Sequence, residues 1–61
     1  MFAINYVYEG TTTITGEVTL SGEKGEYKTC DILNHIAWEL EDMGIEEGTG
    51  IIRYDNVVAP Y

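Results

Sequence analysis

Residues 30–43 constrain this chain most, because they read as one amphipathic helix whose tryptophan lies opposite its apolar residues. At about 100° per residue, the apolar side chains form one continuous stripe made of Ile32, Leu33, Ile36, Ala37, Leu40 and Met43. Trp38 projects to the side opposite that stripe. A helix in this register must bury the stripe against another element and leave Trp38 on its outer face.

Both ends of this helix carry termination signals. Thr29 is predicted to be the N-cap, and Asp31 lies in the first turn, where negative charge is favourable. Gly44 fits the left-handed C′ position at the other end. Ile45 would then contact Leu40, as in a Schellman motif.

Alternation of apolar and polar residues predicts strands on both sides of the helix. Residues 2–9 and 12–20 alternate clearly, and Gly16 within the second run suggests a bulge or a close backbone approach. Residues 26–29 can add a short third strand, and residues 51–54 read as a strand after the helix. The pair Asp55-Asn56 is either a two-residue turn to a last strand at 57–59 or a kink in one longer strand, and Pro60 places that segment at a sheet edge.

Together these elements predict an α+β fold in a single domain spanning residues 1–61. We expect an antiparallel sheet of three to five strands with the helix 30–43 on one face. The order along the chain is strand, strand, an optional third strand, helix and strand. The other sheet face, rich in threonine, would meet solvent or a second subunit.

A chain of 61 residues has only a small core. Its one cysteine, Cys30, makes no intramolecular disulfide, so the chain must depend on packing, self-association or both. We therefore expect a homodimer formed through the threonine-rich sheet face, an edge strand or the Trp38 face. The lone cysteine, the absence of a basic-flanked leader and the absence of an apolar run near ~20 residues predict a cytoplasmic protein that does not enter a membrane.

The sequence carries no catalytic motif, so we expect no enzyme activity and no cofactor or metal. His35 is the only imidazole, and one histidine with one cysteine does not complete a four-ligand zinc site. Cys30 and His35 diverge by about 140° on the helix, too far for an activated thiolate. The sequence favours binding over chemistry.

Eleven acidic and three basic residues give a formal net charge of -8, which repels nucleic acid and anionic membranes and attracts basic protein surfaces. Acids crowd the end of the helix, where they oppose the macrodipole, and no Lys or Arg lies between residues 29 and 52. A tryptophan among such acids is typical of an interaction surface. The predicted partner-binding residues are Trp38, Asp31, Asn34, Glu41 and Asp42. The alternative is an acidic face that only keeps the protein in solution.

The short chain, the acidic run ELEDMGIEEG at residues 39–48 and the helix face with Trp38 resemble a type of small inhibitor. Bacteriophages and mobile elements encode such acidic proteins against host defences, among them anti-CRISPR and anti-restriction proteins. The resemblance implies an inhibitor that occupies a nucleic-acid- or nucleotide-binding site on a host protein, as a nucleic-acid mimic. The alternative function is a structural or assembly subunit of a virion or complex.

Overall fold

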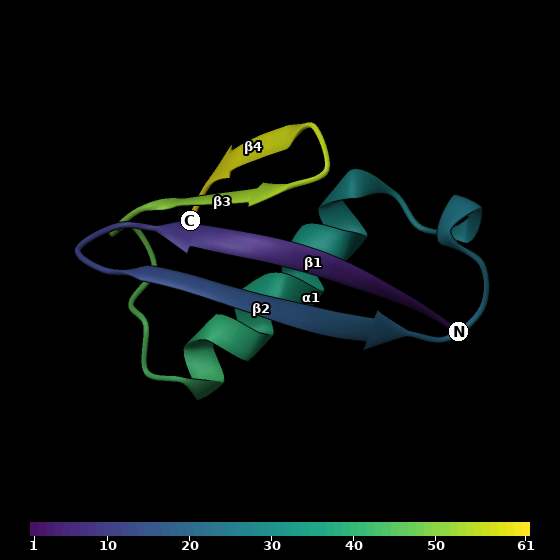
Figure 1. Ribbon diagram of the computed structural model, residues 1–61, viewed down its shortest axis with the longest axis horizontal. Helices are drawn as coiled ribbons and strands as arrows, with labels where there is room; N and C mark the ends of the chain where they lie inside the picture. The colour runs from purple at the N-terminus through teal and green to yellow at the C-terminus, as the bar shows by residue number, and fades with distance from the viewer.

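The chain folds into two layers, one sheet and one α-helix, in a computed structural model that describes residues 1–61 (Figure 1). The elements in chain order are β1 (Phe2–Glu9), β2 (Thr13–Leu20), the 3-10 helix η1 (Lys24–Glu26), α1 (Thr29–Asp42), β3 (Ile51–Tyr54) and β4 (Val57–Pro60). The four strands are antiparallel in the spatial order β2-β1-β3-β4. The α+β class, the helix and its place on one sheet face are therefore confirmed.

The second half of the chain departs from the predicted order. The expected third strand at residues 26–29 is wrong, because residues 24–26 form η1 and Thr29 already belongs to α1. The Glu23 backbone N–H donates to the Glu26 carboxylate at 2.8 Å, which holds this segment as a turn. The additional strand follows the helix instead, since Asp55 adopts a φ of 49° in a two-residue turn that joins β3 to β4.

Helix α1 begins and ends one residue earlier than the predicted range 30–43, and the predicted termination signal at Gly44 is confirmed. Lys28, not Thr29, is the N-cap, and its backbone N–H donates to the Asp31 carboxylate at 3.1 Å. At the other end Gly44 has a φ of 84°. The Ile45 N–H bonds to the Leu40 carbonyl at 3.0 Å and the Gly44 N–H bonds to the Glu41 carbonyl at 2.9 Å, which confirms the Schellman motif.

The core lies between α1 and one face of the sheet. Ile32, Ile36 and Leu40 are the buried residues of the helix, and they meet a set of buried strand residues. That set is Ile4, Tyr6, Tyr8, Val18, Leu20, Ile52 and Tyr54, with Tyr61 beyond β4. The prediction that Met43 belongs to the buried stripe is wrong, since it is 48% exposed. Met43 caps the end of α1, which projects past the β2 edge of the sheet (Figure 1).

Gly16 marks a close approach and not a bulge. The register between β1 and β2 is continuous, with Tyr6 opposite Gly16. A Cβ atom added at Gly16 would lie 2.5 Å from the Tyr6 hydroxyl oxygen, so the tyrosine ring fills the space above the glycine. A glycine in this strand lets a core ring cross from one strand to the next.

Tyrosine hydroxyls connect this core to the loop after the helix. The Tyr61 hydroxyl lies 3.2 Å from the Ile45 carbonyl and 3.4 Å from the Ala37 carbonyl. The Tyr8 hydroxyl bonds to the Thr49 hydroxyl. Thr49 uses its own proton for the Glu46 carbonyl, at 2.6 Å, so Tyr8 is the donor. These bonds hold residues 45–50 against the sheet.

The opposite sheet face carries no covering layer. Thr13, Thr15, Glu17 and Thr19 of β2 are exposed there, as the alternation in the sequence predicts. No helix of the protein is long and apolar enough to cross a membrane.

Leu40→Ala tests the helix register. Because Leu40 is 0% exposed, the substitution is expected to lower the free energy of unfolding by about 2–5 kcal/mol. Met43→Ala is the matched control and should change it by no more than about 0.5 kcal/mol. Urea unfolding of both variants measures the difference, and equal losses would contradict the register.

Candidate binding surface

All five predicted partner-binding residues lie on the exposed side of α1. Trp38 is 58% exposed and lies opposite the buried stripe, as its position in the helix predicts. Asn34, Glu41 and Asp42 are exposed around it. The helix thus presents a large aromatic side chain and three polar ones to solvent. We call this set, with Asp31, the outer face of α1.

Asp31 differs from the other four, because its carboxylate caps the helix. Its oxygen accepts the Lys28 backbone N–H, so part of its hydrogen-bonding capacity is already used. Glu26 has the equivalent role for η1 through the Glu23 N–H. An acid that stabilises a helix start explains Asp31 without any partner.

Trp38 belongs to a row of four edge-to-face rings. The ring centroids lie 5.1 Å apart for Trp38 and His35, and 6.2 Å apart for His35 and Tyr27. Phe2 completes the row at 5.4 Å from Tyr27. The indole therefore packs against His35 on one side, and an aromatic side chain with few rotatable bonds loses little entropy on binding. Only the three-residue spacing of His35 and Trp38 signalled this row in the sequence.

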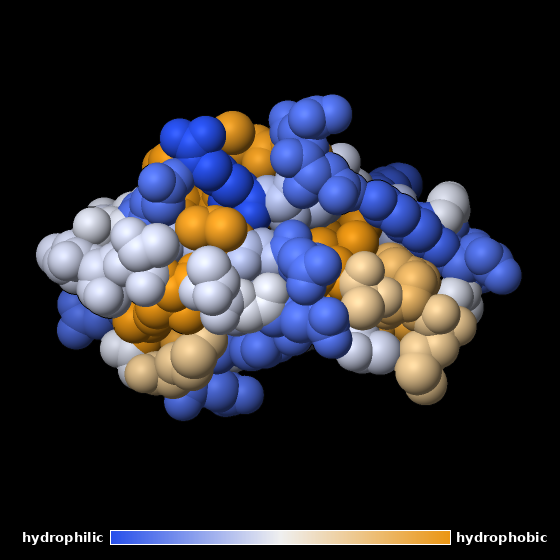
Figure 2. All heavy atoms as spheres, in the orientation of Figure 1, coloured by the Kyte–Doolittle hydropathy of each residue, from blue (hydrophilic) through white to orange (hydrophobic).

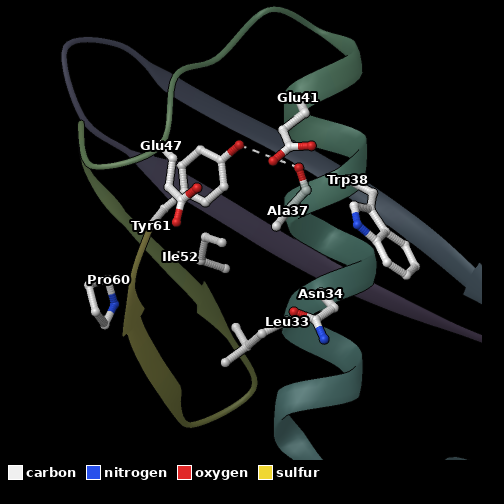
Figure 3. A pocket seen from close by; sticks show the side chains of 9 residues that line it. All are labelled: Leu33, Asn34, Ala37, Trp38, Glu41, Glu47, Ile52, Pro60 and Tyr61. Atoms are coloured by element: carbon white, nitrogen blue, oxygen red, sulfur yellow. Dashed lines mark hydrogen bonds between the residues drawn. The ribbon is translucent and has the colours of Figure 1, made fainter.

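A groove runs along the other flank of the helix, between α1 and the β3–β4 hairpin (Figure 3). Its volume is about 250 Å³. Nine residues line it: Leu33, Asn34, Ala37, Trp38, Glu41, Glu47, Ile52, Pro60 and Tyr61. Figure 3 shows that the Trp38 ring points away from this groove, whereas Asn34 and Glu41 border it. Asp31 and Asp42 do not line it.

Two carboxylates flank Tyr61 at the end of this groove. Glu41 comes from the last turn of α1 and Glu47 from the loop that follows, and the tyrosine ring lies between them (Figure 3). Burial raises the pKa of the Tyr61 hydroxyl above its ordinary value of 10.0, and the charges of Glu41 and then Glu47 raise this pKa further, followed by Tyr8. No base neutralises this pair of carboxylates within the groove.

The three basic residues lie elsewhere. Arg53 pairs with Glu9 on the open sheet face, and Lys24 pairs with Asp55 at the β3–β4 turn. Lys28 precedes α1, and the last turn of the helix contains no base. The acids of residues 39–47 therefore add to the negative end of the helix dipole without compensation.

The structure holds no group of three or more His, Cys, Asp or Glu side chains placed to bind a metal ion. Cys30 is a free, exposed thiol. Comparisons with protein-family models, with curated proteins and with solved structures found no match to this chain.

High pH tests the surroundings of Tyr61. The hydroxyl is neutral in both the folded and the unfolded chain below its ordinary pKa of 10.0, and above that pH the unfolded chain loses its proton first. The free energy of unfolding is therefore expected to fall as the pH rises above 10.0, and to fall less steeply in Tyr61→Phe. Urea unfolding of both proteins across this range measures the slopes, and parallel curves would contradict the assignment.

Proposed function

We propose that this protein is a non-enzymatic binding protein that presents the outer face of α1 to a basic surface on a partner protein. The observation that carries the proposal is Trp38, which is 58% exposed in the middle of a helix whose exposed side chains are polar or acidic. Tryptophan is enriched among the residues that dominate interface energies. Within one chain the indole contacts the His35 ring edge to face, and more than half of its surface stays in solvent.

The uncompensated charge supports the same conclusion. Glu41 and Asp42 lie in the last turn of α1. Each negative charge there lowers the stability of the helix by about 0.3–1 kcal/mol, because it opposes the helix dipole. Acids at the C-terminal end of a helix are unfavourable, and their presence there without a visible gain in stability is a sign of function. A basic partner supplies the missing compensation.

The groove beside the outer face extends this surface. Its floor is apolar at Leu33, Ala37 and Ile52, and Glu41 and Glu47 stand at its rim. A lysine or arginine side chain fits this combination, with its methylene groups on the floor and its charge between the carboxylates. We propose that the partner inserts such a side chain.

The partner we propose is a host protein, and the effect is inhibition. Glu39 and Asp42 are three residues apart at the end of α1, and acids at that spacing on a helix lie about 5–6 Å apart, close to the spacing of phosphates along a nucleic-acid strand. An acidic helix can therefore occupy a site built for nucleic acid or a nucleotide. The free cysteine Cys30 supports action in the cytoplasm.

Capture from a host lysate tests the outer face. Trp38→Ala is expected to leave folding intact and to weaken binding to the captured partner by about 2 kcal/mol or more. Glu41→Lys with Asp42→Lys is expected to slow association, with the larger effect at low salt. Calorimetry and association kinetics with the identified partner measure both effects.

A charge-matched variant separates position from net charge. Glu17→Lys with Glu23→Lys makes the same change in net charge away from the outer face, and it should leave binding nearly unchanged. Unfolding of Trp38→Ala would contradict the proposal by making the indole a folding residue. Equal effects of the two charge variants on binding would mean that the acids only keep the protein in solution, as expected of a structural or assembly subunit.

We also propose that two copies associate through the open sheet face. Val58 is 57% exposed there, and Arg53 and Glu9 already neutralise one another. Figure 2 shows hydrophobic atoms at several points of this face, between polar ones. This face thus has the exposed aliphatic area and the low net charge that α1 lacks.

Val58→Asp tests this association. A charge on the open face is expected to convert a dimer into a monomer in sedimentation runs at micromolar concentration. Burying the carboxylate would remove its hydration, and Arg53, which lies opposite position 58, is already paired with Glu9. Thr11→Asp, in the exposed loop between β1 and β2, is the control and should remain dimeric. A monomeric wild-type protein would end the proposal.

A further inference from the structure

The two edges of the sheet are protected very differently. β4 has four residues and ends at Pro60, which has no N–H to offer another strand. β2 has eight residues and pairs with β1 along its whole length, with no proline, lysine or bulge. Natural proteins usually protect an edge strand of that length from pairing with other chains. An unprotected edge of this length therefore indicates a binding role.

The helix extends beneath the open edge. Figure 1 shows that the C-terminal part of α1 passes behind β2 and continues beyond it. Ile14 of β2 is only half-buried, and Met43 at the end of the helix is 48% exposed. A strand added beside β2 would therefore have this helix end behind one of its faces. We call this feature the ledge and define it by Tyr6, Ile14, Gly16, Glu39 and Met43.

The ledge contains the one buried side-chain hydroxyl that lacks a partner. The Tyr6 hydroxyl has no hydrogen bond, although the residue is 2% exposed. The Tyr6 ring extends from β1 across the core side of Gly16, so its hydroxyl lies beside β2. The hydroxyls of Tyr8, Tyr54 and Tyr61 all have partners. The lone pairs of this hydroxyl have no donor, so they are free to accept a hydrogen bond from a polar group that arrives from outside.

The charge beside this hydroxyl is negative. Burial raises the pKa of Tyr6, and the half-buried Glu39 carboxylate raises this pKa further, by its charge and as an acceptor near the hydroxyl, although the two do not meet in a hydrogen bond of normal geometry. A cation between the two would pair with Glu39 and donate to the free lone pairs of the tyrosine oxygen. Lysine and arginine are the side chains with that chemistry.

We propose that the ledge binds an extended segment of another protein as a fifth strand, with a lysine or arginine of that segment at Glu39 and Tyr6. Main-chain bonds to β2 would give affinity, and alternate side chains would reach the ledge. The site is distinct from the outer face of α1, so this inference goes beyond the proposed function, and each can fail without the other.

A second copy of this chain does not fit the same edge. Two β2 strands paired about a two-fold axis share one sheet, which places both α1 helices on the same face. Each helix projects past its own edge, so the two helix ends would compete for one space (Figure 1). Both chains also carry a net charge of -8. The occupant must be opposite in charge and must lack a covering helix.

The probe is a capped peptide of alternating lysine and valine, matched to the eight residues of β2. Amide NMR spectra of the full chain are expected to change along β2 and the C-terminal half of α1, and hydrogen exchange of β2 should slow. The same peptide with alternate backbone nitrogens methylated keeps its charge but loses its donors. It should bind at least about tenfold more weakly.

Two variants test the ledge, and two variants of the outer face are their controls. Glu39→Gln should weaken binding of the lysine–valine peptide by about tenfold. Glu41→Gln, on the other flank of the helix, should leave the binding of this peptide unchanged. Tyr6→Phe should weaken binding of the peptide. The free energy of unfolding should stay the same or rise, because the substitution removes an unpartnered hydroxyl. Trp38→Ala should leave peptide binding unchanged, which separates this site from the outer face.

Four results would overturn the inference. They are equal binding of the methylated peptide, spectral changes centred on Trp38, no binding of the lysine–valine peptide at low salt, and a slowing of β2 exchange that grows with protein concentration in the absence of peptide. The last would assign the edge to a second copy.

Discussion

Burial of one stripe of α1 against one face of the sheet is the interaction on which the rest of the structure depends. Ile36 and Leu40 are fully buried, and together with Ile32 they fix the rotation of the helix. That rotation directs Trp38 and the acids of the last turn to solvent. With a single helix there is no further layer, so neither the outer face of α1 nor the other sheet face is covered within one chain.

Tyrosine allows such a small chain to close its core. Its ring is long enough to reach a neighbouring element, and its hydroxyl then satisfies a carbonyl there, as Tyr61 does for Ile45 and Tyr54 does for Thr29. Tyr6 is the exception, because its hydroxyl has no partner and Glu39 lies nearby. A buried unpartnered hydroxyl costs about 1–3 kcal/mol, so its presence sets the ledge apart from the rest of the core.

Local periodicity predicted the helix, the strands β1 and β2 and the exposure of Trp38, because those features depend on neighbours in sequence. The η1 turn was mistaken for a strand, because the alternation at residues 26–29 was given more weight than the local bond from the Glu23 N–H to the Glu26 carboxylate that holds the turn. The row from Phe2 to Trp38 and the groove that includes Tyr61 were not predicted for a different reason. Each joins residues that only the tertiary structure brings together.

The central claim is that the acids at the end of α1 repel one another without compensation in the free protein. Unfolding measured from about 0.01 M to about 0.15 M salt tests it, since the Debye length falls from about 30 Å to about 8 Å. The free energy of unfolding should rise with salt. Glu41→Lys with Asp42→Lys should flatten that rise more than the equally charged Glu17→Lys with Glu23→Lys. A stability that does not rise with salt, or equal slopes for the two variants, would contradict the account.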